Sequence, residues 1–319
     1  MNLFLKKLLY IIVMLFIISL ISFIAINLAP NSFFASGELN PNITPEAIEQ
    51  LKAIYGLDKP LYIQFFSWFY SILHFDFGIS FSSGATVKEE ILSRIPITLT
   101  INIISMVLIF IISLYFGIKS AMSQNSFFDK FTKQLSLLSF SMPSFYLALV
   151  LVLIFSIKFE LFPIAGLHNV TNDGSFTYYL DFAWHLVLPI FIIVFGGIGS
   201  LILYIRALTI EILKSDYIFF AHARGLNKKQ ILRYYILPNL YPPVITLLGL
   251  SLPAVVGGSV ILETIFSIDG MGLLFYQSAL SHDYPVIMGI LIIGAFLTLI
   301  GNMFADLVLL KLNPNYNEK

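Results

Sequence analysis

Few residues in this 319-residue chain could do chemistry, and they are scattered. The absence of cysteine excludes disulfides, thiolate catalysis and cysteine metal sites. The histidines lie in different segments without the paired spacing of metal ligands, so we expect no metal site. They are His74, His168, His185, His222 and His282. No serine–histidine–acid arrangement is interpretable, and no glycine-rich phosphate loop with Lys-Ser/Thr occurs, so we predict neither an enzyme nor a bound cofactor.

The most ordered polar pattern is the segment 216–238, which predicts two helices joined by a tight break. Ser215 or Asp216 can cap the first helix, and Gly225 supplies the left-handed residue that stops it. Asn227, with Gln230 three residues later, resembles a capping box that starts the second helix.

The first of these helices has the composition of a docking surface. Ala221 and Ala223 are small residues beside the aromatic Tyr217, Phe219 and Phe220. Such a surface is suited to lying in a groove on another protein.

The elements that position this segment are predicted to be membrane helices. Hydrophobic residues make up 58% of the chain and charged residues only 11%, which excludes an ordinary soluble domain. Apolar runs of about 20 residues recur, as expected for helices and not for a β-barrel. The fold class is therefore all-α and polytopic, with six spans near 8–28, 97–118, 136–157, 184–206, 239–262 and 286–310. The second span contains the polar residues Asn102, Ser105 and Ser113 but no charged residue.

Two segments leave alternatives open. Lys6 and Lys7 precede the apolar run 8–28, which is interpreted as a retained span but superficially resembles a secretory signal. The apolar stretch 61–73 is short and follows Pro60, which favours an interfacial or buried outer helix over a seventh span. In the long first outer loop, Thr44 and Pro45 can start a helix that Gly56 ends.

The distribution of lysine and arginine sets the orientation, because cytoplasmic loops are enriched in both. With both termini in the cytoplasm, the inner segments hold thirteen of the eighteen: Lys6, Lys7, Lys119, Lys130, Lys133, Arg206, Lys214, Arg224, Lys228, Lys229, Arg233, Lys311 and Lys319. The formal net charge of zero argues against a nucleic-acid partner.

The loop around Gly225 resembles that of permease subunits of binding-protein-dependent ABC importers. Phe220-Ala221-His222-Ala223-Arg224-Gly225 is similar to the Thr-Ala-Arg-Ala-Lys-Gly form of the peptide and nickel branch, and the spacing to Ile236 and Pro238 agrees within one residue. The exact Glu-Ala-Ala triplet is absent. Further similar runs are Tyr55-Gly56-Leu57-Asp58-Lys59-Pro60-Leu61, Phe75-Asp76-Phe77-Gly78-Ile79-Ser80, Arg94-Ile95-Pro96-Ile97-Thr98-Leu99, Ser141-Met142-Pro143-Ser144-Phe145, 257–266, 270–273, Asp283-Tyr284-Pro285 and Asn313-Pro314.

The resemblance covers nearly the whole chain and implies the first permease of a dipeptide, oligopeptide or nickel importer of type I. Such a chain forms half of a pathway with a homologous second permease, in the inner membrane. Two separate ATPase subunits, which carry ATP and Mg, and a periplasmic or lipoprotein binding protein complete the system. The implied domains are 1–96, a first span plus outer loop; 97–310, five core helices with the coupling loop 207–238; and the cytoplasmic tail 311–319.

The resemblance also assigns residues to coupling and to the pathway. The coupling residues are Asp216, Tyr217, Phe220, Ala221, Ala223, Arg224, Gly225 and Pro238. Ordinary cytoplasmic charge is the alternative interpretation of Arg224, and it applies at least equally to Lys228 and Lys229. Pro253, Gly257, Gly258 and Ser259 in the fifth span fit close helix packing or pathway lining. Glu263 and Asp306 lie near the ends of their spans, where charge is less costly.

Two other classes of protein remain to be separated from an importer. A membrane enzyme would need polar catalytic groups clustered within spans, and a channel or secondary transporter would need no docking loop. Peptide, nickel and other metal chelates remain open as cargo. Neighbouring genes for an ATPase, a second permease and a binding protein would favour the importer.

Overall fold

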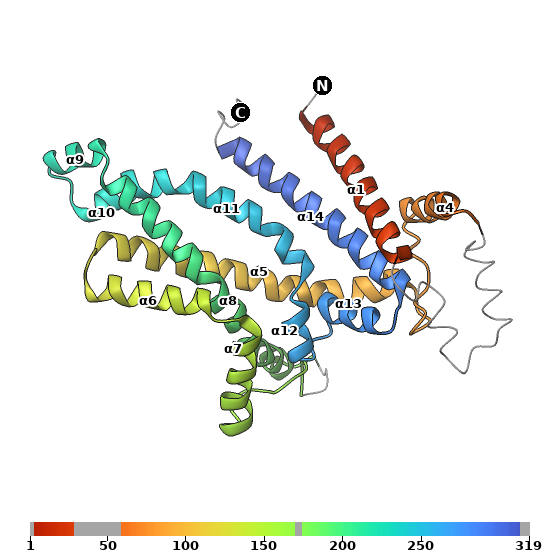
Figure 1. Cartoon of the computed structure of the whole chain (residues 1–319). Coiled ribbons are helices and arrows are strands. Elements are labelled where there is room, and N and C mark those ends of the chain that lie inside the picture. The colour runs from red at the N-terminus through yellow and green to blue at the C-terminus, as the bar shows by residue number, and fades with distance from the viewer. Residues whose placement is uncertain (1–2, 29–58, 170–173, 313–319) are drawn as a thin grey trace. The chain divides into compact units, whose positions relative to one another are not determined.

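The computed structural model describes residues 3–28, 59–169 and 174–312, which fold almost entirely as helices (Figure 1). Within these ranges the chain's β-type pairing is an isolated bridge between Ile79 and Thr86. The helices are α1 (Leu3–Leu28), α4 (Leu61–Leu73), α5 (Val87–Met122), α6 (Phe127–Ser141), α7 (Ser144–Leu151), α8 (Phe176–Leu213), α9 (Asp216–Ala223), α10 (Lys228–Ile231), α11 (Leu237–Gly257), α12 (Val260–Ile265), α13 (Met271–Leu280) and α14 (Tyr284–Leu312), with π-helical segments η1 (Val152–Lys158) and η2 (Leu232–Ile236). The helix expected between Thr44 and Gly56 lies outside the described residues.

The all-α membrane class is confirmed. Among the described residues, five helical stretches are long and apolar enough to cross a membrane, or six if the bent pair of α6 with α7–η1 counts as one span. The spans predicted at 97–118 and 184–206 lie inside the longer helices α5 and α8, of 36 and 38 residues. At about 1.5 Å per residue both helices extend well beyond ~30 Å of hydrocarbon.

The third span, predicted over 136–157, is not one continuous helix. The chain ends α6 at Ser141 and starts α7 at Ser144, with a bend of 99° between the two helices. Pro143 causes the break, because proline has no N–H to donate and excludes the helical conformation at the preceding residue. Met142 is accordingly extended, with φ −90° and ψ 119°.

The fifth span, predicted over 239–262, is also interrupted. α11 ends at Gly257, and Gly258 has φ +64°, in the left-handed region that favours glycine. α12 begins two residues later at Val260.

The described chain divides into two compact units. The first consists of Met1–Thr98, Val256–Val260 and Asp269–Ile300. Within it, α4 packs through Phe65 against Phe23 of α1 and Met288 of α14. Beside this buried face, α4 exposes Tyr62, Phe66 and other large apolar residues. Because its 13 residues are about 20 Å long, α4 is too short to cross ~30 Å of hydrocarbon, which favours an interfacial or buried helix.

The second unit consists of Leu99–Val255, Ile261–Ile268 and Gly301–Lys319. In it α6 lies closely along α8, because Gly199 has no side chain. A Cβ at Gly199 would lie 2.5 Å from the Ser136 carbonyl oxygen and 2.7 Å from the Ser139 hydroxyl. The pair therefore packs backbone against backbone, as small residues allow in membrane helices.

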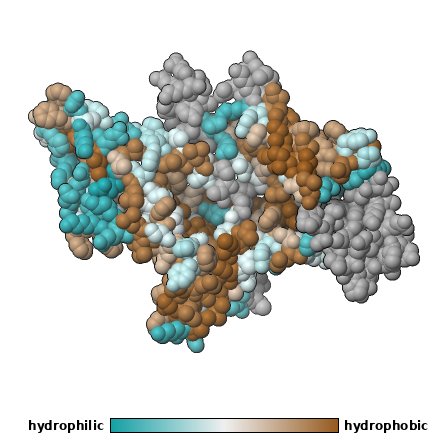
Figure 2. All heavy atoms as spheres, viewed as in Figure 1, coloured by the Kyte–Doolittle hydropathy of each residue, from teal (hydrophilic) through white to brown (hydrophobic). Residues whose placement is uncertain are grey.

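Exposed apolar side chains cover α7 and η1. Figure 2 shows this apolar surface on the lowest projection of the view, and it consists of Phe145, Tyr146, Leu149, Leu153 and Ile157, each about half exposed. A surface of this composition is suited to contact with lipid chains or with another apolar protein surface.

Candidate functional site

The turn between α9 and α10 has the geometry predicted for residues 216–238. Gly225 adopts φ +78°, the Leu226 N–H donates to the Ala221 carbonyl (3.2 Å), and the Gly225 N–H donates to that of His222 (2.9 Å). These two bonds form a Schellman motif, the standard helix ending that places glycine in the left-handed region. The two-helix interpretation and the role of Gly225 in it are confirmed.

The start of α10 is equally well defined. The Gln230 N–H donates to the Asn227 side chain at 3.0 Å, and the Asn227 N–H donates to the Gln230 side chain at 2.8 Å. This reciprocal pair is the capping box that the sequence predicts. The chain therefore leaves α9 and enters α10 in a fixed direction.

The short helix α9 has a buried face and an exposed face. Ile218 and Ala221 are 2% and 1% exposed and belong to an apolar core that also contains Ile205 of α8. Phe219 and Phe220 point outward, with 70% and 63% of their surface exposed. Apolar burial thus holds α9 on the end of α8 and leaves an aromatic face free on the described chain.

The predicted coupling residues divide between these faces. Asp216, Tyr217, Phe220, Ala223, Arg224 and Gly225 are exposed. Ala221 lies on the inner face, where its small side chain lets α9 seat closely on the core. Tyr217 stacks on Tyr235 of η2 with ring centroids 6.2 Å apart.

Pro238 follows a wider helical turn. Residues Leu232–Ile236 form a π-helical segment that joins α10 to α11 without a gap. Proline removes one helical N–H donor, and a π-helical turn is one way to accommodate the missing bond. Pro238 itself is exposed at the start of α11.

A buried ion cluster lies at the α5–α6 turn and on α8. Asp129 is fully buried and accepts hydrogen bonds from Arg206 Nε (2.7 Å) and Nη2 (3.0 Å) and from the Ser120 hydroxyl (2.5 Å). The Asn125 N–H also donates to it, and Lys133 Nζ lies 3.2 Å away. Five donors make this a fully hydrogen-bonded buried charge, which joins three helices.

This cluster was not predicted from the sequence. Arg206 and Lys133 were interpreted as ordinary cytoplasmic charges, and no role was predicted for Asp129. The available signal was the spacing of Asp129 and Lys133, four residues apart on one helix face. Nothing in the sequence pairs Asp129 with Arg206, which lies 77 residues away.

The predicted pathway residues surround the interruption after α11. Gly258 forms the break itself, and Ser259 is half-buried before α12. Glu263 is 4% exposed on α12, and its carbonyl accepts from the Ile268 N–H at 2.9 Å. Pro253 and Gly257 lie in the last two turns of α11, and their surroundings fall outside what the structure describes.

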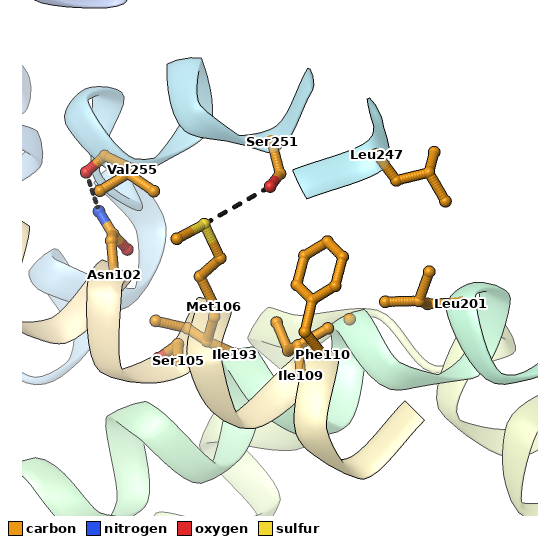
Figure 3. Close-up of a pocket in the computed structure, with 11 residues that line it drawn as sticks. Asn102, Ser105, Met106, Ile109, Phe110, Ile193, Leu201, Leu247, Ser251 and Val255 are labelled. Carbon is orange, nitrogen blue, oxygen red and sulfur yellow. Dashed lines mark hydrogen bonds between the residues drawn. The ribbon is translucent and has the colours of Figure 1, made fainter. Parts of the chain in front are cut away.

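Three helices of the second unit line a pocket of about 350 Å³ (Figure 3). Each contributes one stripe at helical spacing: Asn102, Ser105, Met106, Ile109 and Phe110 from α5; Ile193, Gly197 and Leu201 from α8; and Leu247, Ser251 and Val255 from α11. The Asn102 amide donates to the Val255 carbonyl at 2.8 Å, and the Ser251 hydroxyl lies 3.5 Å from Met106 Sδ. The sequence identified Asn102 and Ser105 as polar residues of the second span, but their shared position on one face of α5 was not predicted.

Motif residues far apart in the sequence meet in the first unit. The Asp283 carboxylate accepts from the Ser80 hydroxyl (2.6 Å) and from the backbone N–H groups of Phe81 (3.2 Å) and Ser82 (3.1 Å). Arg94 bonds Asp269 at 2.7 Å and Glu90 at 2.6 Å. The Asp283 contacts hold the segment after α4 against the segment after α13, and the Arg94–Asp269 pair holds α5 against the segment before α13. The motif residues here therefore stabilise the fold.

Two of the five histidines share a neighbour at the start of α8. His168 Nδ1 and His185 Nδ1 lie 3.9 Å and 3.4 Å from the two oxygens of Asp181. Burial lowers the pKa of His168, although the nearby Asp181 opposes this. In the part of the chain that the structure covers, no group of three or more His, Asp or Glu is arranged to hold a metal ion.

Comparisons with known proteins cover nearly the full length. The family described as "Binding-protein-dependent transport system inner membrane component" matches residues 113–318, and its N-terminal companion matches residues 1–102. The oligopeptide transport system permease protein AppB of Bacillus subtilis (strain 168) is 34% identical over 298 residues, 93% of each chain.

Two further relatives are the oligopeptide transport system permease protein OppB of Haemophilus influenzae, 32% identical over 97% of each chain, and the metal-staphylopine import system permease protein CntB of Staphylococcus aureus. The latter is 31% identical over 87% of this chain and 85% of its own. With these matches and its apolar helices, the chain is a multi-pass transport subunit that belongs to the family of binding-protein-dependent transport system inner membrane components.

Proposed function

We propose that this chain forms half of the translocation pathway of an ATP-driven importer that carries peptides across the cytoplasmic membrane. The names of the relatives AppB and OppB support peptides as cargo. The relative CntB supports a metal chelate as the second candidate, and nickel remains an alternative of that kind.

The observation that carries the coupling part of the proposal is the two-faced helix α9. Its inner face is fixed to the core through Ile218, while Phe219 and Phe220 are held outward on an eight-residue helix with defined ends. A short helix with one face fixed and an aromatic face exposed fits a groove on a partner protein. We assign Asp216, Tyr217, Phe220, Ala223, Arg224 and Gly225 to contact with, or orientation toward, an ATPase subunit, with Ala221 and Pro238 supporting the element from within the chain.

The remaining partners follow from the family. A homologous second permease completes the pathway, two ATPase subunits bind ATP and Mg, and a periplasmic or lipoprotein binding protein delivers the cargo. The distribution of lysines and arginines supports a cytoplasmic location of both termini and of α9. Pro253, Gly257, Gly258, Ser259 and Glu263 are proposed to line or shape the route, because the chain interrupts its helix at Gly258 and non-helical backbone at membrane depth is tolerated where it is buried in protein or lines a cavity.

The test uses the assembled transporter with Phe220→Asp and, as a matched control, Phe127→Asp. Both residues are exposed phenylalanines, at 63% and 87%, but Phe127 lies on α6 and not on α9. We expect Phe220→Asp to abolish co-purification of the ATPase subunit and ATP-dependent uptake, and Phe127→Asp to preserve both. Equal behaviour of the two variants would refute the docking role of α9. Uptake that continues without ATP hydrolysis would favour a channel or secondary transporter.

A further inference from the structure

The pocket between α5, α8 and α11 contains polar groups that the protein does not use fully. The Ser105 side chain is 1% exposed, and its hydroxyl has no hydrogen-bond partner among the described residues. Buried hydroxyls are normally hydrogen-bonded, because leaving one unpaired costs its full desolvation. Asn102 lies one turn away on the same face and uses one amide N–H on the Val255 carbonyl.

The pocket lies between three helices, on the side of α5 away from that helix's exposed apolar face. The opposite face of α5 exposes only apolar side chains at the corresponding positions: Ile103, Ile104, Val107, Leu108 and Ile111. Polar residues within membrane helices face a bundle interior or a cavity, and α5 follows this rule. A lipid chain would gain nothing from the Ser105 hydroxyl, whereas a ligand with a carbonyl group would satisfy it.

Size and charge restrict the ligand. A volume of about 350 Å³ is at the small end of ligand pockets, which suits one side chain and its adjoining backbone but not a whole oligopeptide. Among the described residues, no Asp, Glu, Lys, Arg or His lines the pocket. Apart from Asn102 and the two serines, the lining is apolar, with the adaptable Met106 beside Phe110 (Figure 3).

We propose that the α5–α8–α11 pocket receives an uncharged apolar side chain of a peptide in transit, while Ser105 and Asn102 hydrogen-bond the adjoining peptide group. The proposal rests on the proposed peptide transport. It assigns a specificity to the membrane subunit itself: apolar side chains are held at this point, whereas charged side chains and metal chelates find no partner here. Burial of an apolar side chain supplies the attraction, and the peptide group satisfies the unpaired hydroxyl.

The experiment measures ATP-dependent uptake of Ala-Leu-Ala and Ala-Ala-Ala by the complete importer in proteoliposomes, each variant being compared with wild type for the same peptide. Met106→Phe fills the pocket and should slow uptake of Ala-Leu-Ala about tenfold more than that of Ala-Ala-Ala. Ser105→Ala removes a bond to the backbone that both peptides share, so it should slow both by a similar factor of roughly 2 to 12. Ser113→Ala, a buried serine of α5 outside the pocket, should change neither rate.

A second measurement locates the peptide directly. A tripeptide with photo-leucine at its centre should label segments of α5, α8 or α11 that line the pocket, and Met106→Phe should reduce the label. Three outcomes would overturn the pocket assignment alone. The peptide could label other segments, a photoreactive lipid could label the pocket in place of the peptide, or Met106→Phe could affect uptake of both tripeptides equally. If wild-type importer takes up no tripeptide, the proposed function fails and the pocket assignment fails with it.

Discussion

Replacing Gly225 with valine tests whether the left-handed turn after α9 controls coupling. A Cβ at Gly225 would meet nothing within 4 Å, so the added β-carbon itself makes no clash. The expected cost is backbone strain at φ +78°, about 1–2 kcal/mol for an L-residue and toward the upper end for a β-branched one. About 2 kcal/mol corresponds to roughly a 30-fold loss in the population of the native turn. Asparagine tolerates this conformation and should cost about twofold at most.

The assay is substrate-stimulated ATPase activity and uptake by the reconstituted transporter, after gel filtration has shown that the subunits assemble. Activity should fall in the order glycine, asparagine, alanine, valine. Gly84→Val is the matched control, because Gly84 has φ +75° and equally open surroundings but lies far from α9 in the sequence. If Gly225→Val couples as well as Gly225→Asn, or if Gly84→Val uncouples as strongly, the reasoning is refuted.

Three further perturbations test the packing and charges of the second unit by thermal unfolding in detergent. Asp129→Asn should lower the free energy of unfolding by about 3 kcal/mol, because it leaves a partly buried guanidinium without its carboxylate; an unchanged melting temperature would contradict this. Gly199→Ala should lower the free energy of unfolding by roughly 1–3 kcal/mol through overpacking. Gly196→Ala should be neutral, because a Cβ there would have nothing within 4 Å. Equal melting temperatures for the two variants would show that α6 and α8 can separate freely. His168 has a lowered pKa in the folded state, so the unfolded chain binds more protons and stability should fall as the pH drops below about 6.5. His168→Phe should flatten that decline between pH 7 and 5, and an identical pH profile would contradict the assignment.

The sequence was most informative where the structure depends on neighbouring residues. The capping box of Asn227 and Gln230, the stop at Gly225 and the presence of apolar spans within α5 and α8 are local properties, and all were predicted correctly. Pro143 shows the limit of hydropathy. The apolar run 136–157 reads as one span, although the proline within it was already sufficient to break a helix.

Contacts between distant segments could not be predicted. Asp129 can pair with Arg206 only because α6 and α8 lie side by side, and the close approach of these two helices depends on Gly199. The pocket is a similar case. Asn102 and Ser105 could be assigned to one helix face from their spacing, but the stripes of α8 and α11 that complete the wall become evident only when three helices are packed.

The Asp283 carboxylate has a consequence for how the chain is made. Its partner Ser80 precedes it by 203 residues, so at about 5–20 residues per second the ribosome needs roughly 10–40 s to synthesise the acceptor after the donor. During that interval the N–H groups of Phe81 and Ser82 lack their carboxylate. These three hydrogen bonds of the first unit therefore form only after Asp283 has been made, late in synthesis. Truncations before Asp283 should leave the earlier helices inserted but the Ser80 loop accessible to protease.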